Sequence, residues 1–261
     1  LVPGFERRTI VCLGYLSAPP ESLNLDPSVD YHVYMDMQFH LLATDPLFRG
    51  LYGVMEYMAA YADEESIRWA HRMFRHYCIE GRTDRLIDRP LVLPHVKNPD
   101  FASGLEGWEV ASAEPDAVAG KTMKDLSWLQ GRYPQTEEGD TYCWMRRSAL
   151  GPNRVSQRMR ALEPGTLYSV KAISAGMDNL HEARDLGLCI AVEGAEVLPE
   201  FCFQNRFTSC YSHESGEFTR DRPACFHYHR VVFRPSGTEA VVTLSDWRSP
   251  EAPGAPVGQE T

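Results

Sequence analysis

Hydrophobic and polar residues follow two different periods along the chain, and the change falls near residue 90. Before it, continuous apolar runs alternate with segments in which apolar residues recur every three or four positions. After it, short strand-like segments are separated by Gly, Pro and Asn. The first pattern is typical of alternating strands and helices and the second of an all-β region, so the sequence predicts a mixed fold.

The first region predicts two strands and two helices in the order βαβα. Residues 9–16 and 50–57 are the apolar runs expected of buried parallel strands. Helices are expected after Asp26 and Asp63, which are suitable N-cap residues, and Asp45 followed by Pro ends the first helix. Two such units cannot close a sheet, so their partner strands are expected to lie outside this sequence.

Each predicted helix has an expected buried face, set by the period of an α-helix. The apolar positions that recur on these faces are Val33, Tyr34, Met37 and Leu41 in the first helix, and Ile67, Ala70, Phe74 and Tyr77 in the second. Cys12 and Cys78 also fall in apolar patterns and are interpreted as small core residues.

The second region predicts strands only, at residues 107–112, 140–148, 154–162, 166–176, 187–193, 226–234 and 239–246. Strands of this length and spacing favour a sandwich or jelly roll. The expected organisation is a βαβα segment at residues 1–88, a linker at 89–97 that contains two prolines, and a β region at 98–261. The Pro- and Gly-rich residues 249–261 are expected to be extended.

Charge and cysteine content narrow the function classes. The net charge is -10, which argues against a nucleic-acid or anionic-membrane partner, since both require a basic surface. No apolar stretch approaches the ~20 residues of a membrane span. The 7 cysteines are odd in number and irregular in spacing, so they do not form a disulfide scaffold. Both ends of the sequence are interpreted as cuts within a longer protein.

Three phrases of the second region carry a family resemblance. They are the opening Asn98-Pro99-Asp100-Phe101 with Gly107-Trp108, residues 155–175 (VSQRMRALEPGTLYSVKAISA) and residues 229–247 (HRVVFRPSGTEAVVTLSDW). With them the region resembles the jelly-roll carbohydrate-binding modules attached to xylanases and cellulases. The resemblance implies a galactose-binding-like sandwich with a polysaccharide ligand, although related sandwiches include protein-binding and purely structural members.

The first region resembles the end of a (β/α)₈ glycosidase-like barrel. Residues 35–46 (MDMQFHLLATDP) and 61–69 (YADEESIRW) are similar to phrases in bacterial proteins that combine a barrel with a sugar module. The resemblance implies that the parent protein is a glycoside hydrolase, extracellular or periplasmic, whose remaining barrel strands are partners of this fragment. The fragment alone is expected to be inactive.

The barrel resemblance indicates where catalytic residues would lie, because active sites of such barrels follow the carboxyl ends of the strands. Glu56 is the catalytic candidate there, with Tyr57 and Tyr61 as sugar-binding neighbours. Glycoside hydrolysis needs a second carboxylate, and Asp36, in mid-helix, is a poor substitute. The favoured alternative is that Glu56 faces a helix or a loop and has no chemical role.

Sugar binding typically uses aromatic rings that pack against the C–H faces of pyranoses. Trp128 and Tyr133 lie in a polar loop, and Trp144 lies on a predicted strand, so these three are the candidates for carbohydrate binding. Trp108 is expected in the core, and Trp247, at the end of the last strand, is expected to pack under the termini. Burial of all three candidates would favour a structural or adhesion module without a glycan ligand. A lyase or esterase on the same barrel is a further class, which no GxSxG motif supports.

One cluster of cysteine and histidine is a weak alternative zinc site. It consists of Cys210, His213, Cys225, His227 and His229, of which the last three point to one face of a strand. The spacing matches no zinc-ribbon pattern, and two alternatives stay open: the histidines are buried and hydrogen-bonded, or Cys210 pairs with Cys225. Asp100 or Asp246 could serve a structural calcium ion. No cofactor is predicted.

Overall fold

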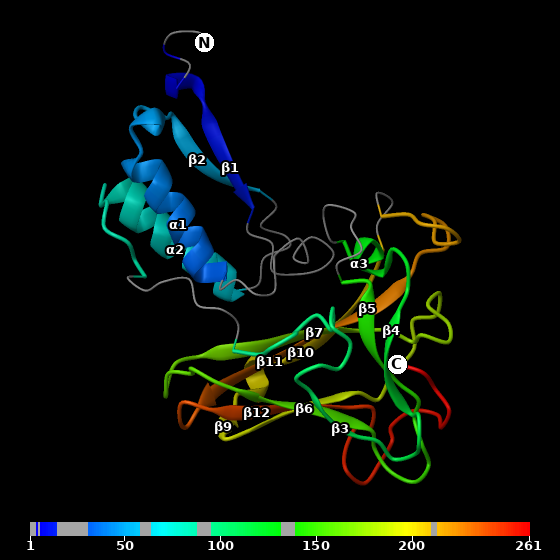
Figure 1. Ribbon diagram of the computed structural model, residues 1–261. Coiled ribbons are helices and arrows are strands. Elements are labelled where there is room, and N and C mark those ends of the chain that lie inside the picture. Colours follow the sequence, from blue (N-terminus) through cyan, green and yellow to red (C-terminus); the bar gives the residue numbers. More distant parts are fainter. Residues whose placement is uncertain are drawn as a thin grey trace. The chain divides into compact units, whose positions relative to one another are not determined.

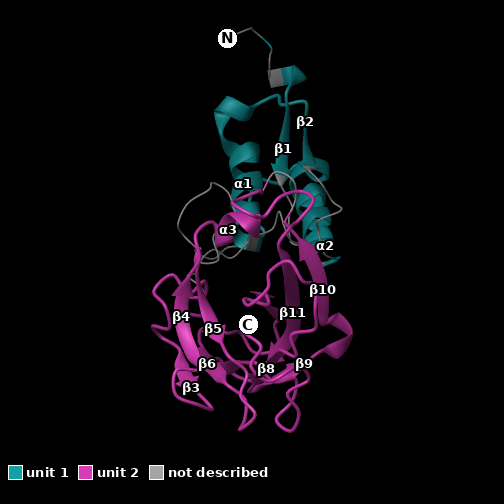
Figure 2. Ribbon diagram, turned by 90° about the vertical axis from the view of Figure 1, so that its right-hand side faces the viewer, with its two compact units in different colours: residues 1–94 teal, residues 95–261 magenta. Residues whose placement is uncertain are grey.

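The computed structural model of the chain describes residues 4, 6–14, 31–57, 64–87, 95–131, 139–209 and 213–261. It divides into two compact units, unit 1 at Leu1–Pro94 and unit 2 at His95–Thr261 (Figure 2). Strands account for 34% of the residues and helices for 19%, so the chain is mostly β-sheet, as the sequence predicts. In the described ranges, no helix has the length and apolarity needed to cross a membrane.

Unit 1 contains two parallel strands with two helices on one face (Figure 1). Its elements are η1 (Glu6–Arg8), β1 (Ile10–Gly14), α1 (Tyr31–Thr44), η3 (Pro46–Phe48), β2 (Gly53–Tyr57), α2 (Glu64–Met73) and η5, a turn of π-helix (Phe74–Ile79). The parallel pairing and the βαβα order are confirmed. Asp45 accepts a hydrogen bond from the N–H of Leu47 at 2.8 Å, and α1 ends at Thr44 as predicted.

The core of unit 1 lies between the strands and the helices, and its buried members are Leu13, Met35, Phe39, Trp69, Ala70, Met73 and Tyr77. The predicted buried faces are therefore partly wrong. The exposed members of those faces are Tyr34, Met37, Leu41 and Ile67. The apolar residues of α1 are distributed around the whole circumference of the helix, so their spacing in the sequence does not identify one buried face. Cys12 and Cys78 are likewise exposed, not core residues.

The described residues of unit 2 form antiparallel sheets, a short α-helix and a turn of 3-10 helix. Its elements are β3 (Glu109–Ala111), β4 (Val118–Thr122), α3 (Leu126–Leu129), β5 (Thr141–Met145), β6 (Arg154–Met159), β7 (Tyr168–Ser174), β8 (Cys189–Glu193), β9 (Ala195–Val197), η6 (Pro199–Phe201), β10 (Phe203–Thr208), β11 (Cys225–Pro235) and β12 (Ala240–Ser245). Each predicted strand overlaps one of these, whereas β4, β9 and β10 were not predicted.

The strands of unit 2 form two four-stranded sheets and a hairpin-like pair. One sheet has the order β3-β6-β12-β8, the other has the order β10-β11-β7 with β9 also pairing with β11, and β4 pairs with β5. Side chains from both four-stranded sheets share one core, to which β6 contributes Met159, β12 Val242 and β11 Phe233. A second core lies under α3 and includes Leu129 and Phe226. Figure 1 shows β7 and β11 stacked above β6 and β12.

The C-terminal residues are built into unit 2, although part of the segment is irregular. The N–H of Thr261 donates to the carbonyl of Met145 at 2.9 Å, and the N–H of Met145 donates back at 2.8 Å. Gln259 is buried, so residues 258–261 act as an additional pairing segment beside β5 rather than as a free extension. At the other end of unit 2, Lys97 of the predicted linker donates its N–H to Gln157.

Candidate functional site

Glu56 lies at the carboxyl end of β2, where it pairs with Leu13 of β1. Strand alternation places its side chain on the same face as Val54, which packs against the core beneath the helices. Its Oε1 atom is buried and has no hydrogen-bond partner among the described residues. Burial raises the pKa of Glu56, which favours the protonated carboxyl. The side chain of Tyr57 and the whole of Tyr61 lie outside the described residues.

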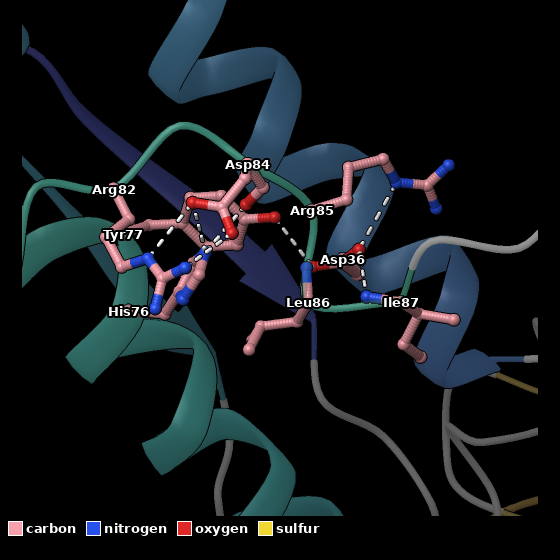
Figure 3. Close-up of polar contacts among 8 residues, drawn as sticks. All are labelled: Asp36, His76, Tyr77, Arg82, Asp84, Arg85, Leu86 and Ile87. Atoms are coloured by element: carbon pink, nitrogen blue, oxygen red, sulfur yellow. Dashed lines mark hydrogen bonds and ion pairs between the residues drawn. The ribbon is translucent and has the colours of Figure 1, made fainter.

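Asp36 is the most completely bonded carboxylate of unit 1 (Figure 3). It is fully buried, and its Oδ1 accepts from the hydroxyl of Tyr77 at 2.7 Å and from the N–H of Leu86 at 3.1 Å. Its Oδ2 accepts from the N–H of Ile87 at 3.2 Å and from Nε of Arg85 at 3.3 Å. Since both oxygens are occupied, Asp36 fixes the segment after η5 onto α1 and does not offer a free carboxylate for chemistry.

The same segment is held from its other side by an ion pair on the surface. Arg82 contacts Asp84 at 2.7 Å, and this guanidinium lowers the pKa of the Asp84 carboxyl. The buried ring of His76 has its Nε2 atom 2.6 Å from the carbonyl oxygen of Asp84. The contact with His76 connects this segment to η5.

The candidate aromatic residues of unit 2 occupy different environments. Trp144 is 5% exposed, its Nε1 donates to Glu260 at 2.9 Å, and the Lys121 ammonium lies 3.2 Å from its ring centroid. Trp128 is half-buried, makes an edge contact with His213, and donates to the carbonyl of Glu214 at 3.3 Å. Tyr133 lies outside the described residues. One face of Trp144 is therefore already occupied by a cation.

Trp108, which was expected in the core, and Trp247 are both half-buried. Trp108 packs against the core between the two four-stranded sheets, and its Nε1 donates to the carbonyl of Asn98 at 3.1 Å. This hydrogen bond connects the loop that begins at Asn98 to the sheets of unit 2. Trp247 follows β12 and is also half-buried.

The cysteine and histidine cluster is occupied by hydrogen bonds. Nδ1 of His227 lies 2.9 Å from the amide of Gln204, and Nε2 of His229 lies 2.7 Å from the hydroxyl of Ser174. Cys225 has its Sγ 3.5 Å from the carbonyl of His181. Within the described ranges, which leave out Cys210, no three metal-ligating side chains come together.

The residues considered for calcium are also engaged. Asp246 is buried and accepts from both the N–H and the side-chain amide of Asn153, at 2.8 and 2.7 Å. Asp100 accepts from the N–H of Ala102 at 3.3 Å. These contacts give each carboxylate a structural role in its own loop.

An open cleft lies between β8 and β10, which are edge strands of different sheets. Its volume is about 290 Å³, near the lower end of the range for small-molecule sites. The residues that line it are Leu188, Cys189, Ile190, Cys202, Phe203, Gln204, His229, Arg230, Val231 and Arg248. Residues 188–190 and 229–231 lie on predicted strands, whereas Phe203 and Gln204 lie on β10, which the sequence pattern does not predict.

Strand register determines which side chains face the cleft. Gln204 pairs with His229 across β10 and β11, so both side chains leave the same face, together with Val231. Val231 and Ile190 also pack against the core between the sheets. The cleft therefore combines an apolar floor with hydrogen-bonding groups on its sides. Phe203 pairs with Arg230 and faces the opposite way.

His229 is the most deeply buried polar side chain of the cleft. It is 5% exposed, and its burial, followed by the charge of His227, lowers its pKa to about 4. Burial is also the main cause that lowers the pKa of His227. Both imidazoles are consequently neutral at pH 7, and the tautomer of each is set by its neighbour, Ser174 or Gln204.

The depressed pKa of His229 predicts a loss of stability in acid. The unfolded chain takes up a proton near pH 6.5, whereas the folded chain takes it up only near pH 4. Between these values the unfolded state binds more protons, so stability falls as the pH falls. At pH 4.5 the loss is expected to be about 2 to 3 kcal/mol. Urea unfolding at pH 7.5 and 4.5 measures it.

The matched variant for this measurement is His229→Gln, which keeps a hydrogen-bonding group beside Ser174. It is expected to lose most of the difference between the two pH values, while His71→Gln, at an exposed position, keeps it. Equal pH dependence in His229→Gln and the unmodified chain would show that other groups cause the acid sensitivity.

Comparisons of the chain with protein-family models, with curated proteins and with solved structures give no significant match.

Proposed function

We propose that the chain is part of a carbohydrate-active protein and that unit 2 binds a polysaccharide in the cleft between β8 and β10. In this proposal the sheets of unit 2 form a jelly-roll sandwich of the carbohydrate-binding type. Unit 1 is then the end of a (β/α)₈ glycosidase-like barrel. The observation that carries the proposal is the lining of the cleft, which is apolar at the floor and polar at the sides.

A sugar ring needs this combination of surfaces. Its C–H faces pack against apolar side chains, and its hydroxyls require donors and acceptors that fix the orientation. Ile190 and Val231 supply the apolar contact, and Gln204 supplies both a donor and an acceptor. Arg248 adds further donors. Because the cleft is open, a polymer can enter without a free chain end.

The aromatic candidates form a second location for the same function. Trp128 is half-buried and could stack on a sugar through its remaining exposed surface. Trp144 would have to exchange Lys121 for the ligand, because the ammonium lies over its ring. We therefore place the main contact in the cleft, and Trp128 with Tyr133 at a secondary position.

The parent protein is proposed to be a glycoside hydrolase. Glu56 faces the core beneath the helices together with Val54, so the alternative that gives it no chemical role is favoured. Hydrolysis requires two carboxylates across the sugar, which the proposal assigns to the barrel strands outside this sequence. The 261-residue chain is therefore expected to bind glycans without hydrolysing them.

Calorimetry of the 261-residue chain against xylan, mixed-linkage glucan, galactomannan and polygalacturonate tests the binding. A shallow contact of this kind corresponds to dissociation constants of about 10⁻³ to 10⁻⁵ M. Gln204→Ala removes a hydrogen bond and is expected to weaken binding about 2- to 10-fold. The matched control is Asn205→Ala, which changes the next residue of β10 on the opposite face and should leave binding unchanged.

Two outcomes would overturn parts of this proposal. Binding that is lost in Trp128→Ala but not in Gln204→Ala would move the site to the loop after α3. A chain that binds none of the polysaccharides would be a structural or adhesion module. The burial of Trp144 is the observation that favours this second candidate function.

A further inference from the structure

We propose that the polysaccharide bound by the cleft is acidic, and that Arg248 contacts the carboxylate of a uronic acid. The inference rests on the proposed function and adds the class of ligand. Its starting observation is the contrast in charge between the protein and the cleft. The chain has a net charge of -10, yet the residues that line the cleft include Arg230 and Arg248 and no Asp or Glu.

A further arginine, Arg206, lies close to the residues that line the cleft. Arg206 lies two residues after Gln204 on β10, on the same face, and its side chain donates to the carbonyl of Ala183 at 3.4 Å. The charge of Arg206 also acts on Asp185, the neighbouring carboxylate that Arg248 contacts. The guanidinium groups of Arg206 and Arg248 thus lie beside the cleft together with the carboxylate of Asp185, whereas the side chain of Arg230 points away with Phe203.

The contact between Arg248 and Asp185 shows that a carboxylate fits this position. The Arg248 side chain is 56% exposed, so part of its guanidinium remains accessible while it contacts Asp185. Asp185 itself is held in place by the N–H of Gly187 at 2.9 Å. A planar guanidinium binds carboxylates through two parallel hydrogen bonds, which neutral hydroxyls cannot match. A ligand carboxylate can therefore share Arg248 with Asp185 or replace it.

The test compares two forms of one polymer, polygalacturonate and its fully methyl-esterified form, which keeps the sugar and removes the charge. The unmodified 261-residue chain is expected to bind polygalacturonate at least about 5-fold more tightly at low salt, an effect typical of one charge-assisted contact. The preference should shrink at 0.5 M NaCl, because salt screens exposed charges. Dextran sulfate serves as a polyanion without uronic acid.

Two substitutions at the ion pair are expected to act in opposite directions. Arg248→Gln should weaken binding of polygalacturonate about 5- to 10-fold and leave the methyl ester unaffected. Asp185→Asn keeps the acceptor for Gly187 but releases Arg248, so it should strengthen binding of polygalacturonate. Arg234→Gln is the matched control, since it removes an exposed arginine that pairs with Glu196 on β9.

The outcomes separate this inference from the proposed function. Equal binding of both polymers, sensitive to Gln204→Ala, would overturn the acidic ligand and leave the polysaccharide site intact. Dextran sulfate binding as tightly as polygalacturonate, or Arg234→Gln acting like Arg248→Gln, would reduce the preference to general attraction of polyanions and overturn the inference. If neither polymer nor any neutral glycan binds, both proposals fail.

Discussion

Replacing Asp36 by alanine is expected to lower the free energy of unfolding of unit 1 by about 3 to 5 kcal/mol. The substitution removes a buried carboxylate that accepts from Tyr77, Arg85, Leu86 and Ile87. Each buried donor still pays the cost of desolvation in the folded state, but the hydrogen bond to Asp36 that offset this cost is lost. The segment after η5 should then detach from α1, so the amides of Leu86 and Ile87 should lose protection from hydrogen exchange.

The matched control is Asp84→Ala, which removes an exposed carboxylate three residues before Ile87 in the same segment (Figure 3). Its ion pair with Arg82 lies on the surface, where such pairs contribute little. Urea unfolding together with hydrogen exchange measures both variants. A loss in Asp36→Ala no larger than in Asp84→Ala would contradict the role of Asp36 as the anchor of the segment.

Replacing Arg147 by methionine is expected to destabilise unit 2 by about 3 kcal/mol. Arg147 is 1% exposed, and its guanidinium donates to the carbonyls of Leu186 and Asp246 and to the side chain of Gln259. It thereby joins the loop before β8, the end of β12 and the C-terminal segment. Methionine fills a similar volume but leaves these oxygens without donors.

The neighbouring Arg146 provides the control for this substitution, because its side chain is exposed. Arg146→Met should change the unfolding midpoint of unit 2 only slightly. In Arg147→Met the C-terminal residues should also become susceptible to carboxypeptidase, since Gln259 loses its contact with the guanidinium. Midpoints that coincide for the two variants would show that the buried guanidinium is not required.

The alternation of apolar and polar residues was sufficient to predict most strands of unit 2. It failed for the three-residue β9, and for β4 and β10, whose sequences VAGKT and FQNRFT contain glycine, lysine, asparagine and glutamine. These strands form because β5 and β11 offer them complementary backbone edges, which is information from outside the segment. In unit 1 the end of α1 was predictable from Asp45 and Pro46, but the buried face of α1 was not.

The candidate site illustrates the same limit. Alternation correctly predicted that His227 and His229 point to one face, and their ring centroids lie 6.4 Å apart. Their hydrogen-bond partners could not be predicted, because Ser174 and Gln204 come from other strands whose register is fixed by the sheet. The position of the Lys121 ammonium over the ring of Trp144 likewise depends on the pairing of β4 with β5, which the sequence of either strand alone does not reveal.

The central claim, that unit 2 binds polysaccharide between β8 and β10, is tested most directly by mapping the contact on the protein. The measurement is an NMR titration of the isotope-labelled 261-residue chain with short oligogalacturonates. We predict that the largest shifts fall on the amides of residues 188–190, 202–204 and 229–231 and on the side chain of Arg248. Shifts that centre on Trp128 and His213 instead would contradict the claim.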